Sequence, residues 1–557
     1  MKISREDKYL YLILVIALIF RIPGIFDGLP AVYNSTEHFL ARMALSMGAG
    51  KTIDPGLYIY PTFYTYILLI LYGSYYLICN IFNIFGNQYD FAAQFLTDPS
   101  AIYILSRIFN VGLSLMTIVF IYQFLKRQTN LTTAKIAATF MAISLNLVRF
   151  SSYATADTLL ILFSTLTILF FYKLADSPSK KDFFITGFFC GLSIAAKYNA
   201  GFLAIGLILL VIQRWYDRRI QLFPALSLSF GGIAIGFFIT NPLWLIYPEK
   251  FYQGWQVISS QMYSAVSAER GTPFLWEISH LIQQEMIIGF LFVLSTVFYI
   301  IRRDYKHYPL LIVIILTFLY VGTWTKKGID YLYAIFPAWI ILSASFLDHI
   351  QKTYINKKII KIFVVLIILL PSFVSVILHS VRLTNPDTRE QATEWIVHNI
   401  NKEQTVCYDN YHNDLGVFDI ERYLSYGASA DQLPDGVKEK LIQFSTDSRQ
   451  VSFISIVVQN TNDIPETDIA YEEIALKYRR RTLNELLDKD TSFFISNNWY
   501  YDSYLSIEID DYPPGVQKSI REVQEFYKQL TKNYTPVKVF SPEFWTAGPS
   551  ISIYDLR

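Results

Sequence analysis

Long apolar runs separated by short polar segments fill the first 380 residues of the chain. A helix that crosses a bilayer needs roughly 20 mostly apolar residues, with a range of about 17–25. Twelve runs reach or approach this length, so the pattern predicts an α-helical polytopic membrane part. The runs lie at about 9–28, 59–83, 101–125, 132–150, 154–174, 182–197, 199–213, 222–246, 280–301, 308–323, 330–347 and 359–380.

The basic residues between the runs indicate which runs cross the membrane, because cytoplasmic loops are enriched in Lys and Arg. If every run except 59–83 crosses, the short loops on one side hold 19 basic residues and the longer loops on the other side hold 8. If 59–83 also crosses, every later loop changes sides and the bias is reversed. We therefore predict eleven crossings of a plasma (inner) membrane, with 59–83 packed in or on it. The N-terminus is then cytoplasmic and the C-terminal part extracytoplasmic.

The pattern changes after about residue 380. Residues 388–399 have helical spacing, with Ala392 and Ile396 on one face. Segments of strand length follow and alternate with helical segments at 483–489 and 517–532, which predicts a small soluble α/β domain. The expected strands lie at 404–408, 451–458, 492–496, 536–540 and 550–555. The predicted organisation is a membrane domain over 1–380, with outer loops at about 29–100 and 247–279, and an extracytoplasmic α/β domain over 381–557.

The charge of the two parts differs as well. Hydrophobic residues make up 53% of the 557 residues and charged residues only 17%, whereas about a quarter of the residues in soluble domains are charged. The net charge of +1 hides an asymmetry: residues 381–557 hold 18 basic and 28 acidic side chains, and the first 380 hold 29 and 18. The basic residues lie between apolar runs, where the bilayer accounts for them, so nothing indicates nucleic-acid binding.

The sequence contains no clear motif for a metal or a nucleotide. Cys79, Cys190 and Cys407 form no metal-type pair or disulfide framework, and no Gly-rich phosphate loop appears in the C-terminal part. One His beside one Glu, at His38 and Glu37, is a weak signal for a divalent cation. The sequence therefore establishes no cofactor and leaves a divalent cation open. The basic N-terminus is followed by no small-residue cleavage site, so we expect the first run to be retained.

Ionisable residues gather at the predicted outer ends of the runs. Charged side chains in or beside spanning helices are costly and often mark functional sites. Simpler explanations exist: Asp157 suits a helix N-terminus, Lys197 suits the lipid interface, and Arg107 suits an ion pair. Together, the carboxylates suit general-base chemistry on a hydroxyl group, and the cations suit a phosphate. The group comprises Glu37, His38, Arg107, Asp157, Lys197, Lys326, Lys327 and Asp330.

Over about residues 9–350, the motifs around these residues resemble the GT-C-type membrane glycosyltransferases. The similarity is to the protein mannosyltransferase and aminoarabinose transferase group (glycosyltransferase family 39 and its bacterial relatives). Their order, together with eleven predicted crossings, carries the resemblance. The motifs are Arg21-Ile-Pro-Gly, Tyr33-Asn-Ser-Thr-Glu-His, a Gly48-to-Pro55 stretch, Tyr60-Pro-Thr-Phe-Tyr-Thr-Tyr, Asp98-Pro-Ser with Ser106-Arg107, Val148-Arg-Phe-Ser-Ser-Tyr-Ala-Thr-Ala-Asp157, Gly191-Leu-Ser-Ile-Ala-Ala-Lys197-Tyr-Asn and Lys327-Gly-Ile-Asp-Tyr-Leu-Tyr-Ala-Ile-Phe-Pro337.

The resemblance implies a reaction at the outer face of the membrane, in which a sugar passes from a polyprenyl phosphate to an acceptor with inversion. It also implies that Glu37 matches the Glu of an Asp-Glu pair whose Asp is the proposed catalytic base. The Asp position is Thr36 here, and a threonine hydroxyl is not basic at neutral pH. Either Glu37 or Asp157, which matches a second acidic position, takes the base role, or the acceptor geometry differs, or activity is lost. Lys197 and the pair at 326–327 match the cationic positions expected to hold the lipid phosphate.

The sequence thus predicts a glycosyltransferase with Glu37 and Asp157 as catalytic candidates. Its expected partners are a polyprenyl-phosphate sugar donor, membrane lipids, and a protein, polysaccharide or lipid acceptor. One alternative, motivated by Thr36, is a non-catalytic binder of lipid-linked sugars. Another is a lipid or sugar transporter, which would require acidic residues at mid-depth and internal repeats. The substrate-binding candidates are Lys197, Lys326, Lys327, Arg107, Thr36, His38 and Tyr60.

Overall fold

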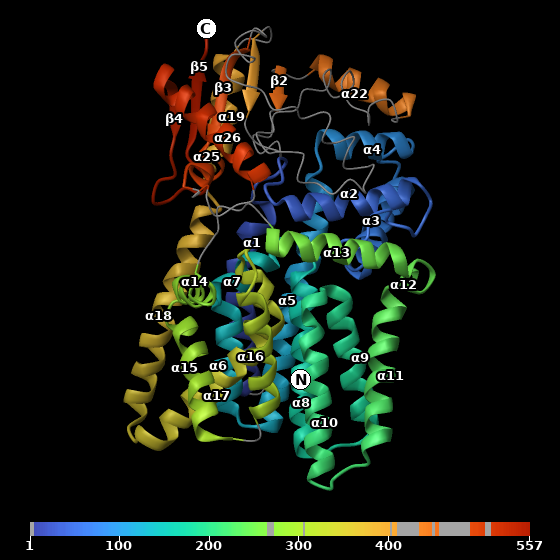
Figure 1. Ribbon diagram of the computed structural model, residues 1–557, viewed down its shortest axis with the longest axis vertical. Helices are drawn as coiled ribbons and strands as arrows, with labels where there is room; N and C mark the ends of the chain where they lie inside the picture. The colour runs from blue at the N-terminus through green and yellow to red at the C-terminus, as the bar shows by residue number, and fades with distance from the viewer. Residues whose placement is uncertain are drawn as a thin grey trace.

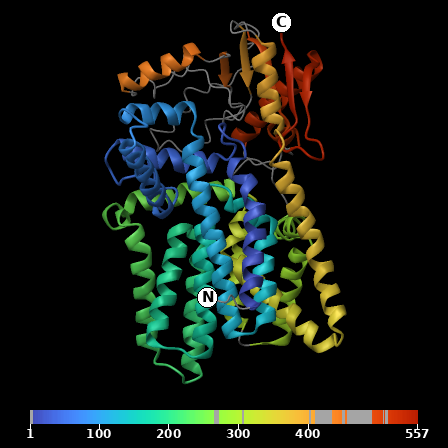
Figure 2. The same cartoon turned by 180° about the vertical axis from the view of Figure 1, so that it is seen from behind.

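A computed structural model of the chain describes residues 5–264, 272–304, 307–400, 404–408, 434–447, 452–455, 491–506, 509 and 514–557. Its larger part is a bundle of helices, and a smaller α/β unit covers one end of that bundle (Figure 1). The view from behind shows the same two-part arrangement (Figure 2). The predicted fold class, a helical membrane protein with a C-terminal α/β unit, is confirmed.

The bundle is built from apolar helices whose exposed surface is also apolar. On α18, for example, Ile359 and Leu370 are largely exposed, as expected for side chains that lipid covers. The bundle helices are α1 (Arg5–Phe26), α5 (Ser100–Gln128), α6 (Leu131–Ile143), α7 (Leu145–Ser151), α8 (Asp157–Asp176), α9 (Lys180–Ala196), α10 (Gly201–Tyr216), α11 (Leu222–Thr240), α15 (Ile287–Arg302), α16 (Tyr308–Gly322), α17 (Phe336–Tyr354) and α18 (Lys358–Arg382), with the short 3-10 helices η1 (Tyr198–Ala200) and η3 (Ile329–Ile335).

Helices of spanning length form most of the runs that we predicted to cross, and also the run at 59–83, which we predicted not to cross. In the described part of the chain, eight helices are long and apolar enough to cross a membrane, or nine if the bent pair α6–α7 is one span. The runs at 182–197 and 308–323 form α9 and α16, of 17 and 15 residues. The run at 280–301 is divided between the end of α14 (Leu275–Glu285) and α15, which has 16 residues. All three helices are near the lower limit of about 17 residues for a spanning helix. These three helices nevertheless run beside the longer ones (Figure 1).

Short helices lie at the end of the bundle that carries the α/β unit (Figures 1 and 2). Helix α2 begins after Asn34, whose side chain accepts hydrogen bonds from the amides of Thr36 and Glu37. Such a cap fixes where a helix starts. The group comprises α2 (Ser35–Ala49), α3 (Phe63–Ile81), α4 (Gln88–Thr97), α12 (Leu243–Ile246), α13 (Pro248–Ser264) and α14 (Leu275–Glu285).

Helix α3 corresponds to the run at 59–83 that we predicted not to cross. Its length and composition would allow a span. Both views, however, place it with α2, α4 and α13 at the end of the bundle (Figures 1 and 2). That it does not cross stays a prediction.

The C-terminal unit contains one five-stranded mixed sheet in the order β2-β1-β3-β5-β4. Strand β1 pairs in parallel with β2 and β3, and β5 pairs antiparallel with β3 and β4. All five predicted strands are present within a few residues of their expected bounds; the predicted helix at 483–489 lies outside the described residues. The elements are β1 (Thr405–Tyr408), β2 (Ser452–Ser455), β3 (Thr491–Asn497), β4 (Pro536–Phe540) and β5 (Ile551–Asp555), with α19 (Thr388–Asn399), α22 (Asp435–Asp447), α25 (Asn498–Leu505) and α26 (Pro514–Asn533).

Alternate residues of the central strands pack against different helices. Val406 belongs to a buried cluster with α19, whereas its neighbour Cys407 belongs to a buried cluster with α26. Since successive side chains of a strand point to opposite faces, the two helices cover opposite faces of the sheet. The predicted helices at 388–399 and 517–532 therefore supply both layers of this unit.

Several contacts among the described residues join the α/β unit to the helices below it: Arg382 on α18 donates to the carbonyl of Phe544 at 2.9 Å, and charged side chains of α19 and α22 make two others. At the first of these two, the guanidinium of Arg389 lies 3.4 Å from the ring centroid of Tyr33, in the segment before α2. Arg389 is held in place by the carboxylate of Asp387. At the second, α22 packs on α4 and Lys440 lies 2.6 Å from Asp90. The contact of Arg389 reaches the segment that leads directly into Thr36 and Glu37.

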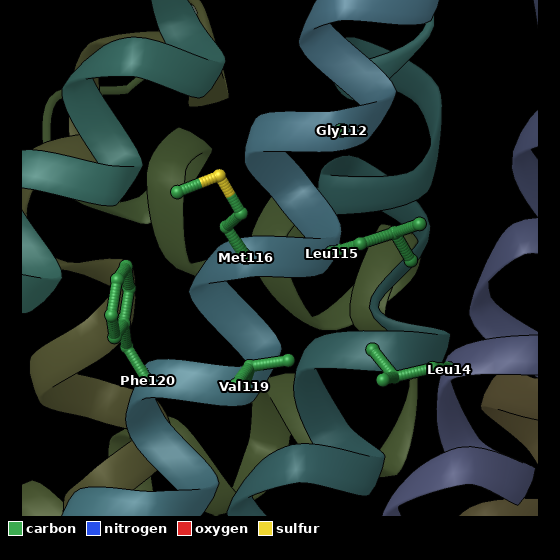
Figure 3. A pocket seen from close by; sticks show the side chains of 6 residues that line it. All are labelled: Leu14, Gly112, Leu115, Met116, Val119 and Phe120. Carbon is green, nitrogen blue, oxygen red and sulfur yellow. The ribbon is translucent and has the colours of Figure 1, made fainter.

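An apolar groove of about 260 Å³ lies between α1 and α5 on the surface of the bundle. Figure 3 shows Leu14 on one side and the α5 residues on the other. None of the candidate site residues lines it, so the groove is not the candidate site. Its lining residues are Leu14, Gly112, Leu115, Met116, Val119 and Phe120.

Candidate active site

Glu37 and Arg107 form a completely buried ion pair. The guanidinium donates from Nε to Oε1 at 2.7 Å and from Nη2 to Oε2 at 2.8 Å, and the amide of Ala154 donates to Oε1 at 2.7 Å. Both side chains are 1% exposed or less. Each carboxylate oxygen thus already has its donor, and the pair ties α2 to α5 and to the loop before α8. This geometry favours a structural role for Glu37 over the base role considered from the sequence.

Arg107 is equally occupied. Its Nη1 group donates to the carbonyls of Ile25 at 3.1 Å and Asp27 at 2.7 Å, at the end of α1. Because its donors point at the protein itself, Arg107 is not free to bind a phosphate. The ion pair expected as its simpler explanation is what the structure contains.

A second charged group is built around Lys197, which lies between α9 and η1. Its Nζ is 2.5 Å from Oδ1 of Asp157 and 3.6 Å from Oδ2 of Asp330. Asp157 is the first residue of α8, and its other oxygen accepts a hydrogen bond from Thr155 at 2.8 Å. Two carboxylates therefore flank one ammonium group, contributed by three different elements.

The group around Lys197 is more exposed than the pair of Glu37 and Arg107. The side chain of Asp157 is 4% exposed, but those of Lys197 and Asp330 are 15% and 27% exposed. Asp157 accepts fewer hydrogen bonds than Glu37, so lone pairs of its carboxylate remain for a further donor. The arrangement combines a proton acceptor with an ammonium group that a phosphate oxygen could approach.

Two further candidates lie beside this group. The phenol of Tyr60 contacts the side chain of Thr36 and lies within electrostatic range of Lys197, Asp330 and Asp157. Tyr60 thus lies near the charged group and Thr36 contacts Tyr60; that either residue binds substrate stays a prediction.

His38 is directed elsewhere. Its Nδ1 lies 3.1 Å from the hydroxyl of Tyr103 on α5. Since its neighbour Glu37 is taken up by Arg107, the two do not form the cation site considered from the sequence. Among the residues that the structure describes, no group of three or more His, Cys, Asp or Glu side chains could hold a metal ion.

The two lysines at 326–327 have different environments. Lys327 is buried, with its Nζ 2.7 Å from Oε1 of Glu277 on α14 and 3.1 Å from the carbonyl of Gly322. Lys326 is half-buried, makes no ion pair in the described ranges, and acts electrostatically on Asp330. Only Lys326 of the two has an ammonium group that remains for a ligand.

Sequence reasoning left two of these acidic residues without a role. Asp330 was noted among the outer ionisable residues but not assigned to the site, although the Lys327-Gly-Ile-Asp spacing brings it to the same end of the bundle. Glu277 was missed. An acidic residue within the apolar segment Leu275-Trp-Glu-Ile-Ser-His-Leu was the available signal.

The fold and one part of the sequence match known proteins. Residues 99–246 match the family model described as dolichyl-phosphate-mannose-protein mannosyltransferase, whereas no curated protein sequence matches the chain. The fold is similar to that of the oligosaccharyltransferase of Archaeoglobus fulgidus in the apo form, with a TM-score of 0.52, 12% identity, and coverage of 91% of this chain and 72% of that one.

A second solved structure matches over nearly its whole length. It is ArnT from Cupriavidus metallidurans in the apo state, with a TM-score of 0.50, 12% identity, and coverage of 99% of this chain and 98% of that one. The family match and these two fold matches confirm the predicted GT-C-type architecture.

Proposed function

We propose that this chain is a membrane glycosyltransferase that transfers a sugar from a polyprenyl-phosphate donor to an acceptor hydroxyl, with inversion, at the outer face of the membrane. The observation that carries the proposal is the Asp157–Lys197–Asp330 group. It lies at the end of the bundle that the α/β unit covers, and it pairs a proton acceptor with a cation. The oligosaccharyltransferase and ArnT have also been solved with dolichol phosphate and undecaprenyl phosphate bound, respectively, which supports a lipid phosphate as the donor's leaving group.

The proposed reaction is a single displacement. The carboxylate of Asp157 removes the proton from the acceptor hydroxyl. The acceptor oxygen then bonds to the anomeric carbon as the bond from that carbon to the phosphate oxygen breaks. The electron pair leaves with the polyprenyl phosphate, and attack from the side opposite the leaving group inverts the anomeric centre.

Lys197 and Lys326 are assigned to the leaving phosphate. Charge that develops on a leaving group is stabilised most effectively by donors already held in place, and the two carboxylates beside Lys197 hold its ammonium group there. When a phosphate approaches, the ammonium group is shared between the phosphate and Asp157. The carboxylate of Asp157 is then less stabilised by Lys197 and accepts the proton of the acceptor hydroxyl more readily.

The buried pairs have supporting roles in this proposal. Glu37 with Arg107 fixes the start of α2, and therefore Thr36, against α5. Lys327 with Glu277 fixes α14 against the segment that leads to Asp330. Thr36 and Tyr60 line the approach to Lys197 as substrate-contacting groups.

The test is release of polyprenyl phosphate by purified protein in liposomes, with a panel of polyprenyl-phosphate sugars. We expect Lys197→Met to lose release, while Lys250→Met keeps it. Lys250 is a suitable control because it is also paired with an aspartate, Asp54 at 3.7 Å, but it lies outside the group around Lys197. Equal release by Lys197→Met and wild type would contradict the proposal.

A second candidate is a protein that binds the lipid-linked sugar without transferring it. The observation in its favour is Thr36, which stands where the resemblance places a catalytic Asp. Folded protein that binds polyprenyl phosphate but releases none from any donor would support this alternative. Transfer gained by Thr36→Asp under the same conditions would support it further.

A further inference from the structure

Another acidic residue, Glu285 at the end of α14, is fully buried in the bundle. Its Oε1 accepts three hydrogen bonds: from Oγ of Ser144 at 2.8 Å, from the amide of Asn146 at 3.0 Å and from Nδ2 of Asn146 at 2.7 Å. Its Oε2 is buried and has no hydrogen-bond partner among the described residues. A buried acidic group is costly, so a specific reason for its presence is expected.

Glu285 lies where two helices break. Helix α6 ends at Ile143 and α7 begins at Leu145, with a bend of 56° between them. Helix α14 ends at Glu285 itself, and the next residue, Met286, has φ 54° and ψ −130°. Such a conformation is strained for a residue other than glycine and persists only when surrounding contacts hold it. The hydrogen bonds of Glu285 to Ser144 and Asn146 join the two breaks.

A continuous path of contacts leads from Glu285 to the charged group. Oδ1 of Asn146 accepts a hydrogen bond from the hydroxyl of Tyr333 at 3.2 Å. Tyr333 is fully buried in η3, the short helix that also carries Asp330. Residues three apart lie on the same face of a 3-10 helix, so a shift of Tyr333 carries Asp330 with it.

We propose that Glu285 is a positioning residue for the charged group: through Asn146 and Tyr333 it holds η3 so that Asp330 stays beside Lys197. The catalytic consequence rests on the proposed function, but the positional one does not. The hydrogen bonds along the path run in one direction: the hydroxyl of Tyr333 donates to the side-chain oxygen of Asn146, and the side-chain nitrogen of Asn146 donates to Glu285. Loss of either link releases η3 and leaves Lys197 with Asp157 alone.

The first test uses the chemistry of Lys197 and needs no turnover. Full-length protein in nanodiscs is treated with an amine-acylating reagent at several pH values, and the labelling of each lysine is followed by mass spectrometry. When the carboxylate of Asp330 moves away, one negative charge that favours the ammonium form of Lys197 is lost. A larger fraction of Lys197 is then the neutral amine that the reagent acylates. We therefore expect Glu285→Leu, which removes the acceptor of all three hydrogen bonds, and Tyr333→Phe each to raise the labelling rate of Lys197 severalfold, while that of Lys250 stays unchanged.

Matched controls separate positioning from general loosening of the bundle. Tyr9→Phe also removes the hydrogen bonds of a phenol, to Thr139 and to the carbonyl of Lys135 on α6, and we expect it to leave the labelling of Lys197 unchanged. In the double variant Glu285→Leu/Tyr333→Phe both changes interrupt the same path of contacts, so its effect should match that of the larger single variant. Wild-type labelling of Lys197 in both single variants, with the protein folded, would overturn the proposal.

The second test measures kcat and KM for sugar transfer. We expect kcat to fall on the order of tenfold in Tyr333→Phe, because misplacement of a reacting group by a fraction of an ångström is costly. Loss of transfer in Lys197→Met with wild-type kcat in Tyr333→Phe would overturn the positioning role alone. Wild-type transfer in Lys197→Met would overturn the proposed function, and the labelling result would then decide the positional claim.

Discussion

The buried pair of Glu37 and Arg107 allows a quantitative prediction about stability. Arg107→Met removes the guanidinium but keeps a side chain of similar length and apolar character. Glu37 is then left with one donor, the amide of Ala154, in a position that water does not reach. The carbonyls of Ile25 and Asp27 also lose the hydrogen bonds that they accept from Arg107.

The magnitude follows from the geometry. Removing one member of a buried ion pair lowers the free energy of unfolding by about 3–5 kcal/mol, because an uncompensated charge remains. Glu37→Gln is milder: its oxygen can still accept from Arg107 and Ala154, while its amide faces a second donor, so we expect a loss of about 1–3 kcal/mol. The double variant Glu37→Leu/Arg107→Met contains neither charge and should be more stable than Arg107→Met alone.

The assay is thermal unfolding in nanodiscs, followed by intrinsic tryptophan fluorescence. Lys250→Met is the control, since exposed ion pairs contribute only about 0–1 kcal/mol. We expect the unfolding temperatures to fall in the order wild type and control, then Glu37→Gln, then Arg107→Met. An Arg107→Met protein that unfolds together with the control would refute the assignment of this pair as the structural link between α2 and α5.

Three further predictions concern the joint between the two parts and the packing of the bundle. Burial raises the pKa of Asp27, just beyond α1, to about 6, and the charges of Arg107 and Arg389 oppose this shift. The carboxyl group of Asp27 therefore binds its proton more tightly in the folded state than in the unfolded state. The free energy of unfolding that this difference contributes is lost as pH rises through about 6. Unfolding temperatures should accordingly show Asp27→Asn more stable than wild type at pH 7–8 and equal to it near pH 4; an equal difference at both pH values would exclude Asp27 as the titrating group. Arg389→Ala removes the group stacked on Tyr33, so limited proteolysis should cut between the bundle and the α/β unit faster than in wild type, and unchanged cleavage would show that the remaining contacts suffice. Gly191→Leu should prevent folded protein from accumulating, as judged by size-exclusion chromatography, because a Cβ there would lie 2.3 Å from the carbonyl oxygen of Ile233 on α11; a monodisperse variant would show that α9 and α11 can separate.

Local elements of the fold followed directly from the sequence. The helix at 388–399 and the five strands could be predicted because each has its own periodicity of apolar residues. These features depend on a few neighbouring residues, and a single sequence contains them completely.

Pairing between distant residues could not be predicted in the same way. The cost of a charge in an apolar helix marks Glu37, Arg107 and Lys327 as unusual, but it does not name their partners. Those partners depend on how helices pack, and Glu277 lies 50 residues from Lys327. The site was therefore recognised as a set of residues, whereas its division into structural pairs and one open group required the structure.

Helix breaks show the same limit. The run at 280–301 was expected to be one span, yet the helix is interrupted at Met286. The two residues at the break, Glu285 and Met286, are not helix-breaking types such as Pro or Gly. The contacts of Glu285 with Ser144 and Asn146 hold the break in place, and these residues are about 140 positions away in the sequence.

The central claim is that the carboxylate of Asp157 takes the proton of an acceptor hydroxyl while Lys197 receives the leaving phosphate. The most direct measurement is release of polyprenyl phosphate from a polyprenyl-phosphate sugar by reconstituted wild type and by Asp157→Asn, with Asp54→Asn as the control. The account predicts release in the presence of acceptor by wild type and control, and its loss in Asp157→Asn although that protein still binds polyprenyl phosphate. Undiminished release by a folded Asp157→Asn protein would contradict it.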